Sequence, residues 1–141
     1  MTPLTFPCAT ISHPLFGQVN RPTMLLDLYS QFFRRWFRLS DVLIDTGADL
    51  SVIPLRLGEA LVPDVELRTP LYLGGAVLQD TPFNAYIHTI EARLGSFQFP
   101  MPVAIALTQT PPVIFGRLQA LDRFHVTFDH GMNVVFTARV G

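Results

Sequence analysis

Residues 42–54 read Val-Leu-Ile-Asp-Thr-Gly-Ala-Asp-Leu-Ser-Val-Ile-Pro. Three apolar residues lead into the carboxylate of Asp45, and after a short polar interruption the chain becomes apolar again. This pattern predicts a buried strand that ends at Asp45 and a sharp turn at Gly47, because glycine permits the turn and leaves its backbone open to a ligand. A carboxylate is costly to bury alone. Asp45 is therefore expected to have a partner or a chemical task.

A second segment, residues 110–117, reads Thr-Pro-Pro-Val-Ile-Phe-Gly-Arg, and it also runs an apolar strand into a glycine turn. Asp-Thr-Gly alone is a weak signal, because a short motif needs its context. Together, and in this order, the two segments resemble those of the retropepsins, the retroviral branch of the aspartic proteases. Asp45-Thr46-Gly47-Ala48 resembles the catalytic motif of that family, and Ala48 is closer to the retroviral branch than the serine of the pepsin branch.

The resemblance implies an all-β domain over residues 1–141, a closed barrel of short strands with one or two short helices that is active as a C2 homodimer. The sequence supports this class independently, because short strand patterns alternate with turn residues throughout. We expect short helices over residues 54–61 and 117–124 and a closing hairpin over 125–138. Residues 13–22 are interpreted as a loop.

Two other segments allow alternatives. Residues 4–11 are expected to form an edge strand, which in the family pairs with the partner subunit, and the alternative is a disordered leader. Residues 23–29 and 36–45 are expected to form a hairpin. The same region also has helical spacing of apolar residues beside Arg34, Arg35 and Arg38, which is typical of a basic helix on a membrane surface. We favour the hairpin because Asp45 must be delivered by a strand.

Length and composition limit the functions that need to be considered. The 141 residues are enough for one domain with a substantial core, and the net charge of −1 gives no general attraction to nucleic acid. No apolar run reaches the roughly 18 residues that span a bilayer. No signal peptide is recognised at the N-terminus, so no stable membrane insertion and a cytoplasmic location are expected.

The residue types exclude several kinds of chemistry. All ten basic residues are Arg, which excludes a lysine nucleophile and a phosphate-binding loop of the Gly-Lys type. The single cysteine and four scattered histidines offer little for a zinc site. We therefore expect no metal and no cofactor.

The resemblance implies hydrolysis of peptide bonds by two carboxylates that share one proton around a water molecule. The chain has one Asp-Thr-Gly, so a homodimer with Asp45 from each subunit on the axis is expected. By resemblance, Asp45, Thr46 and Gly47 are catalytic, with the Thr46 hydroxyl locking the two motifs together. An extended polypeptide substrate would be bound as an added strand. The remaining substrate-binding residues implied by the resemblance are Ala48, Asp49, Gly74, Gly75, Ala76, Pro112 and Ile114.

Of these, Gly74, Gly75 and Ala76 belong to an expected hairpin over residues 68–78, where retropepsins carry the flap that closes over substrate. The family usually has more glycine after this point, and here Ala76-Val77-Leu78 follows. Asp49 and Arg117 are expected to form a structural ion pair, since the planar fork of arginine suits a carboxylate.

The resulting interpretation is an aspartic endopeptidase. The alternative is a retropepsin-like dimer that is catalytically weak and serves as a peptide-binding or scaffolding module, because the departure at residues 76–78 affects the expected flap. A third interpretation, a membrane-surface module, depends on residues 24–38.

Overall fold

The structure is a computed structural model that describes residues 1–73 and 83–139. Strands dominate these residues, which contain one short α-helix and one 3-10 turn, so the all-β prediction is confirmed. The helical elements are α1 (Leu55–Leu61) and η1 (Leu121–Arg123). The strands are β1 (Leu4–Pro7), β2 (Ala9–His13), β3 (Gly17–Arg21), β4 (Thr23–Ser30), β5 (Arg35–Ile44), β6 (Ser51–Ile53), β7 (Thr69–Leu73), β8 (Phe83–Leu94), β9 (Phe97–Ala106), β10 (Ile114–Phe115), β11 (Phe124–Asp129) and β12 (Asn133–Ala138).

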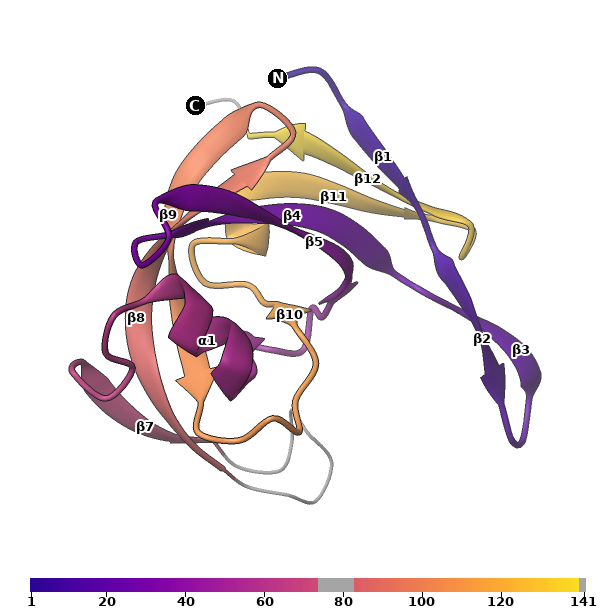
Figure 1. The fold of residues 1–141 in the computed structure, drawn as a ribbon. Helices are drawn as coiled ribbons and strands as arrows, with labels where there is room; N and C mark the ends of the chain where they lie inside the picture. The colour runs from indigo at the N-terminus through magenta and orange to yellow at the C-terminus, as the bar shows by residue number, and fades with distance from the viewer. Residues whose placement is uncertain (74–82, 140–141) are drawn as a thin grey trace.

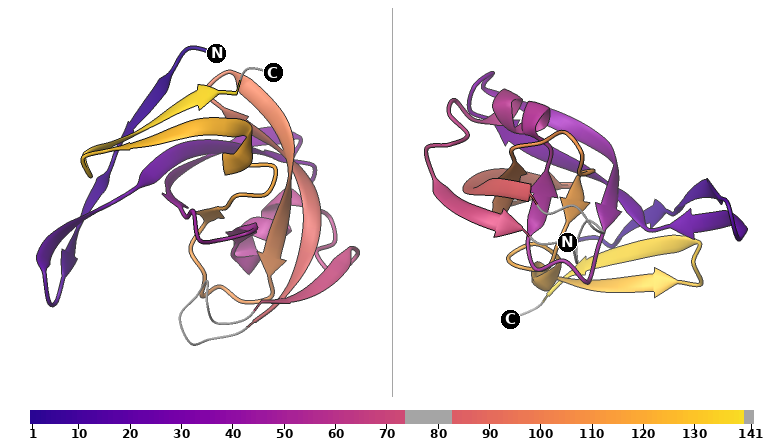
Figure 2. Two further views of the ribbon diagram at one scale, coloured as in Figure 1. Left: turned by 180° about the vertical axis from the view of Figure 1, so that it is seen from behind. Right: turned by 90° about the horizontal axis from the view of Figure 1, so that it is seen from below.

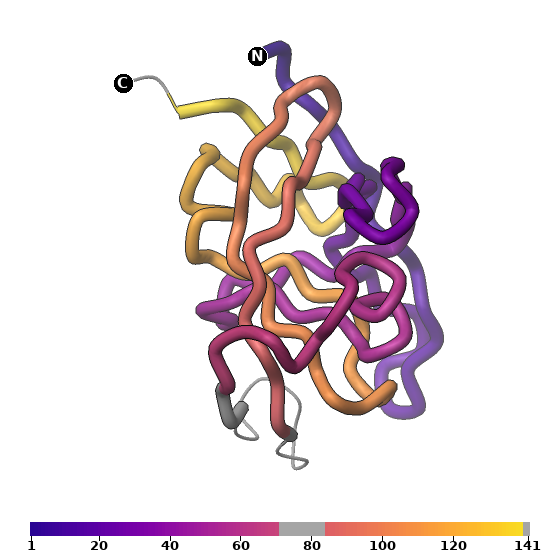
Figure 3. Tube along the Cα trace, turned by 60° about the vertical axis from the view of Figure 1, so that its left-hand side comes forward, coloured from indigo at the N-terminus to yellow at the C-terminus, as the bar shows by residue number. Residues whose placement is uncertain are grey.

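Six strands form a closed barrel in the order β4-β5-β10-β6-β9-β8 (Figure 1). The barrel closes because β8 pairs with β4 as well as with β9. Strand β7 pairs with the first residues of β8, 83–87, on the same edge as β4. The expected closed barrel is therefore confirmed. In Figure 3 the long hairpin of β8 and β9 extends along the length of the molecule.

Strands β4 and β5 form the hairpin that was expected over residues 23–45, so the alternative helix is wrong. Met24, Leu26 and Leu28 alternate into the barrel and are almost fully buried. Ser30 pairs with Arg35 across a four-residue turn that ends at Arg34, whose φ is 55°. This period-two burial is that of a strand in a barrel wall, whereas a helix would have placed Leu26 on the face opposite Met24 and Leu28.

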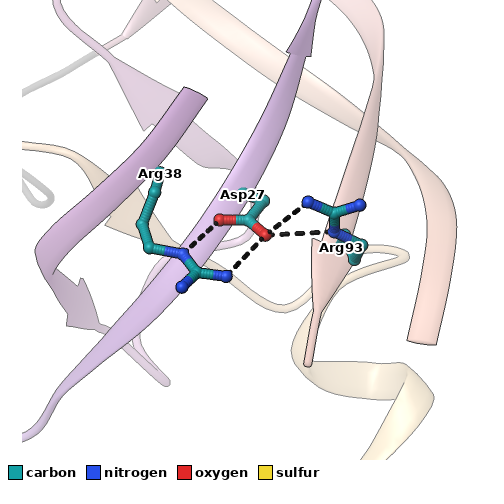
Figure 4. A network of polar contacts seen from close by, with 3 residues as sticks. All are labelled: Asp27, Arg38 and Arg93. Carbon is teal, nitrogen blue, oxygen red and sulfur yellow. Dashed lines mark hydrogen bonds and ion pairs between the residues drawn. The ribbon is translucent and has the colours of Figure 1, made fainter. Parts of the chain in front are cut away.

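One carboxylate ties three strands together where the barrel closes (Figure 4). Asp27 on β4 is buried and binds both Arg38 on β5 and Arg93 on β8. Its carboxylate accepts hydrogen bonds of 2.9 and 3.2 Å from Arg38 and of 3.0 Å from Arg93. The hydrogen bond from Arg38 is the main cause that lowers the pKa of Asp27, burial opposes it, and Arg93 lowers the pKa further.

A second sheet, in the order β1-β12-β11, covers one end of the barrel (Figure 2). It includes the closing hairpin, which is confirmed as β11 and β12. Aromatic rings join this sheet to the barrel by edge-to-face packing with centroids 5.5–6.5 Å apart, a favourable geometry for aromatic pairs. The rings belong to Phe97, Phe99, Phe115, Phe124 and Phe136.

The N-terminal region matches the expectation in part. Strand β1 is an edge strand, as expected, and it pairs with β12 of its own chain, with Leu4 opposite Phe136. Pairing with a partner subunit stays a prediction. Residues 13–22 are not a loop, because β2 and β3 form a two-stranded hairpin that projects from the barrel (Figure 2). Strand β3 has one apolar residue, Val19, too few to show the alternation that would have predicted the hairpin.

The helical predictions are half right. Helix α1 matches the expected helix at residues 54–61, and it packs closely on β9, because a Cβ at Gly58 would lie 2.2 Å from Ile105. The helix expected over residues 117–124 is wrong, since only the 3-10 turn η1 forms there. Gln119 has a φ of 52°, which interrupts a right-handed helix. In the described part of the chain, no helix is long and apolar enough to cross a membrane.

Candidate active site

Asp45 directly follows β5, at the point where this strand leaves the barrel wall. Ile44 and Phe115 pair in parallel, and the Asp45 N–H donates to the Phe115 carbonyl at 3.1 Å. Ile44 is buried, whereas Asp45 is half-buried. The apolar strand therefore anchors the backbone of Asp45 while its carboxylate keeps access to solvent.

The residues after Asp45 form a tight turn around its carboxylate. The Gly47 N–H donates to Oδ1 of Asp45 at 2.9 Å, and the Ala48 N–H donates to the Asp45 carbonyl at 3.2 Å. A Cβ at Gly47 would lie 3.3 Å from the same Oδ1, so glycine leaves the space in which this oxygen sits. Thr46 and Gly47 are exposed. The turn thus presents one oriented carboxylate beside two exposed residues.

The second predicted segment interlocks with the first. Strand β10 lies between β5 and β6, parallel to β5 and antiparallel to β6, so residues 110–117 pass through the loop formed by residues 45–50. A Cβ at Gly116 would lie 2.5 Å from the carbonyl carbon and oxygen of Leu50 and 2.9 Å from the Ala48 carbonyl oxygen. These are backbone atoms, so glycine is required here by the close approach of the two segments.

Ser51 links the same two segments and was not identified from the sequence. It is buried, and its Oγ accepts a hydrogen bond of 3.0 Å from the Gly116 N–H. A buried backbone N–H without an acceptor is costly, so this hydroxyl satisfies the group that the interlock would otherwise leave unpaired. A serine at the start of an apolar strand is too common a feature to have indicated this role.

Asp49 and Arg117 form an ion pair at the surface of the interlock. Their side chains are 83% and 50% exposed, so the pair adds little stability by itself. The backbone holds the segments more firmly, because the Arg117 N–H donates to the Ala48 carbonyl at 3.0 Å and the Leu118 N–H donates to the Asp49 carbonyl at 2.8 Å.

The other predicted substrate-binding residues lie in different environments. Ala48 and Ile114 are buried in a small core cluster below the turn, so in a single chain they support the turn from beneath. Pro112, two residues before Ile114, is exposed. Strand β7 pairs with β8, which begins at Phe83, beyond the expected hairpin over residues 68–78. The second side of that hairpin, with Gly74, Gly75 and Ala76, lies outside the described residues.

The described residues contain no group of three or more His, Cys, Asp or Glu side chains that is arranged to hold a metal ion. What the site offers instead is a single half-buried carboxylate in a rigid turn, on a chain whose sequence has one Asp-Thr-Gly. Such a group can act as an acid or base.

No protein-family model and no curated protein matches the sequence. Solved structures do match. A retropepsin-like aspartic protease from Rickettsia conorii is 14% identical over 96% of this chain and 94% of that chain, with a TM-score of 0.53. The EIAV protease in complex with the inhibitor HBY-793 is 19% identical over 76% of this chain and 88% of that chain, with a TM-score of 0.44. The fold of this chain is retropepsin-like, as the sequence predicted.

Proposed function

We propose that this chain is one half of an aspartic endopeptidase that hydrolyses peptide bonds with Asp45 from each of two copies. The observation that carries the proposal is the interlocked turn, which fixes Asp45 at the end of β5 with its Oδ1 bound to the Gly47 N–H at 2.9 Å and leaves the carboxylate half-exposed. An acid held by backbone contacts at a solvent-accessible position is suited to act on a ligand.

The chemistry requires the two Asp45 carboxylates to share one proton. Two carboxylates about 3 Å apart do not both ionise easily, so one acts as a base toward the water between them. The protonated one donates to the oxygen of the scissile carbonyl as the water attacks its carbon. Because the two carboxylates supply both the base and the acid, this mechanism needs no cofactor or metal.

The second copy is supplied by C2 symmetry, since each chain carries one catalytic motif. In this dimer the Thr46 hydroxyls would hold the two turns together on the axis. The substrate would be an extended polypeptide that pairs with exposed backbone as an added strand. The residues proposed to bind it are Gly47, Ala48, Asp49, Gly74, Gly75, Ala76, Pro112 and Ile114.

The test compares wild type with Asp45→Asn on a peptide library, at mildly acidic and at neutral pH. We expect Asp45→Asn to abolish cleavage while its melting temperature stays close to that of wild type. The matched control is Asp41→Asn, which makes the same change at an exposed position on the same strand and should cleave normally. Cleavage by Asp45→Asn at the wild-type rate would contradict the proposal.

A mixing experiment tests the requirement for two copies. Adding an excess of Asp45→Asn to a fixed amount of wild type should lower activity, because mixed dimers would hold one carboxylate instead of two. Specific activity of wild type alone should also fall on dilution. If activity per chain stays constant in both experiments, one copy acts alone and the proposed dimer is wrong. Peptide binding without any cleavage would favour the non-enzymatic alternative.

A further inference from the structure

The turn between β4 and β5 carries an exposed aromatic and basic surface that the proposed active site does not use. We call residues 31–38 the hairpin tip; they read Gln-Phe-Phe-Arg-Arg-Trp-Phe-Arg. Phe32 and Phe33 are 58% and 51% exposed, and Arg34 and Arg35 follow them, also exposed. The tip is therefore a place where large apolar side chains protrude next to positive charge.

The charge around the hairpin tip is strongly one-sided. No acidic residue occurs between Asp27 and Asp41, and Asp27 is shared by Arg38 and Arg93. When Arg34 and Arg35 are counted as well, four guanidinium groups and one carboxylate give a net charge of +3. Glu91, which lines a cavity with Tyr29 and Gln31, lowers this to +2. The whole chain carries −1, so the positive charge is local.

The tip is held in place by contacts at its base. The Gln31 N–H donates to the Leu61 carbonyl of α1 at 2.9 Å, and the Phe33 N–H donates to Oγ of Ser30 at 2.9 Å. The guanidinium of Arg35 lies 5.0 Å from the ring centroid of Phe37, a cation–π distance. The backbone that carries the aromatic and basic groups is therefore fixed, so little backbone ordering entropy is lost on binding.

We propose that the hairpin tip docks the protein on an anionic lipid bilayer, with Phe32 and Phe33 in the headgroup region and Arg34 and Arg35 against lipid phosphates and carboxylates. Apolar aromatic side chains next to basic ones are the combination that binds such an interface. A bilayer has no shaped pocket, and two adjacent rings that project from a turn do not need one. A folded protein partner would provide such a pocket.

The position of the tip is compatible with the proposed catalytic role. Residues 39–44 of β5 separate Arg38, the last residue of the tip, from Asp45, a span of roughly 23 Å along an extended strand, and Phe32 and Phe33 lie farther along the chain. In Figure 1 the turn between β4 and β5 also lies on the side of the barrel opposite the projecting β2–β3 hairpin. Docking through the tip would leave Asp45 uncovered.

The test is co-sedimentation of the full chain with vesicles of phosphatidylcholine alone and of phosphatidylcholine mixed with phosphatidylserine. Wild type should bind the mixed vesicles at low salt, bind the neutral ones weakly, and be released by raised salt. Phe32→Ser with Phe33→Ser should lower the partition coefficient at least about tenfold, because two rings lose their apolar burial. Arg34→Gln with Arg35→Gln should lower it by a similar factor, since each basic residue near an anionic surface contributes about fivefold.

Two control variants make the experiment specific. Leu15→Ser with Phe16→Ser removes side chains that are 77% and 71% exposed at the tip of the β2–β3 hairpin, and Arg21→Gln with Arg68→Gln removes two exposed charges elsewhere. Both should bind like wild type. No binding of wild type to the mixed vesicles overturns the proposal, as does an equal loss in the controls. Binding to polyglutamate but not to vesicles would also overturn it and assign the tip to an acidic protein segment.

Discussion

Replacing Gly116 by Ala tests the interlock of the two segments. The φ of Gly116 is not in the left-handed region, so the backbone conformation itself accepts alanine. The obstacle is contact, because the added Cβ would lie 2.5 Å from the Leu50 carbonyl atoms and 2.9 Å from the Ala48 carbonyl oxygen. Ordinary contact begins at 3.4 Å, so the two backbone segments must separate by almost 1 Å. Side-chain rotation cannot relieve this, since the contacted atoms are main chain.

The cost follows from that separation. Overpacking a tight site costs about 1–3 kcal/mol. Moving the segments apart also weakens the hydrogen bonds from Gly116 N–H to Ser51 at 3.0 Å and from Arg117 N–H to Ala48 at 3.0 Å, each worth about 1 kcal/mol. We expect a total loss of about 3–5 kcal/mol in the free energy of unfolding. For a chain of this size that corresponds to a fall of about 12–20 °C in Tm.

Thermal unfolding followed by circular dichroism measures this fall, with Gly131→Ala as the matched control. Gly131 has a φ of 69°, and a Cβ there would meet no described atom within 4 Å. Its substitution therefore costs backbone strain alone, about 1–2 kcal/mol or about 4–8 °C. If Gly116→Ala melts within a few degrees of wild type, or above Gly131→Ala, the close packing of the two segments is refuted.

Three further predictions use the same measurement. Because the pKa of Asp27 in the folded protein lies below its ordinary value of 3.8, the stability that ionised Asp27 contributes is complete above that pH and is lost as pH falls toward the folded pKa. The Tm of wild type should therefore fall over this range more than that of Asp27→Asn. Equal falls would contradict the buried network. Ser51→Ala leaves the buried Gly116 N–H without its acceptor and should cost about 1–3 kcal/mol, and an unchanged Tm would refute this hydrogen bond. Arg117→Gln should cost under about 1 kcal/mol because its pair with Asp49 is exposed, and a larger loss would mean that the ion pair holds the turn.

The strands with a clear apolar pattern in the sequence were predicted correctly. The apolar run before Asp45 predicted one strand, and the structure has β5 there. The sequence of β4 shows no alternation, because Leu25 is apolar as well although it is 45% exposed. The hairpin was separated from its helical rival by the requirement that Asp45 follow a strand. The β2–β3 hairpin was missed because β3 has a single half-buried side chain, Val19, and shows no apolar period, although β2 alternates.

The parts that sequence reasoning missed depend on groups that are distant in the chain. Asp27 binds Arg93, which is 66 residues away, and Ser51 accepts a hydrogen bond from Gly116, which is 65 residues away. Neither side chain has a local pattern that distinguishes it from a surface aspartate or an ordinary strand serine. Both became necessary only when the barrel closed and the two segments crossed, since closure buries polar groups that then need partners.

The neighbours of β1 are another feature that sequence alone does not identify. A strand with an unpaired edge satisfies its backbone equally well on any neighbouring edge, and sequence alone does not say whether that edge belongs to the same chain. In this chain β11 and β12 form a full hairpin, and β12 offers an edge to which Leu4–Pro7 pairs directly. Because β1 lies at the edge of that sheet, its outer side is still unpaired within it. A second copy that approaches along this sheet would therefore meet strands already ordered within each chain, so less ordering entropy would be lost on assembly.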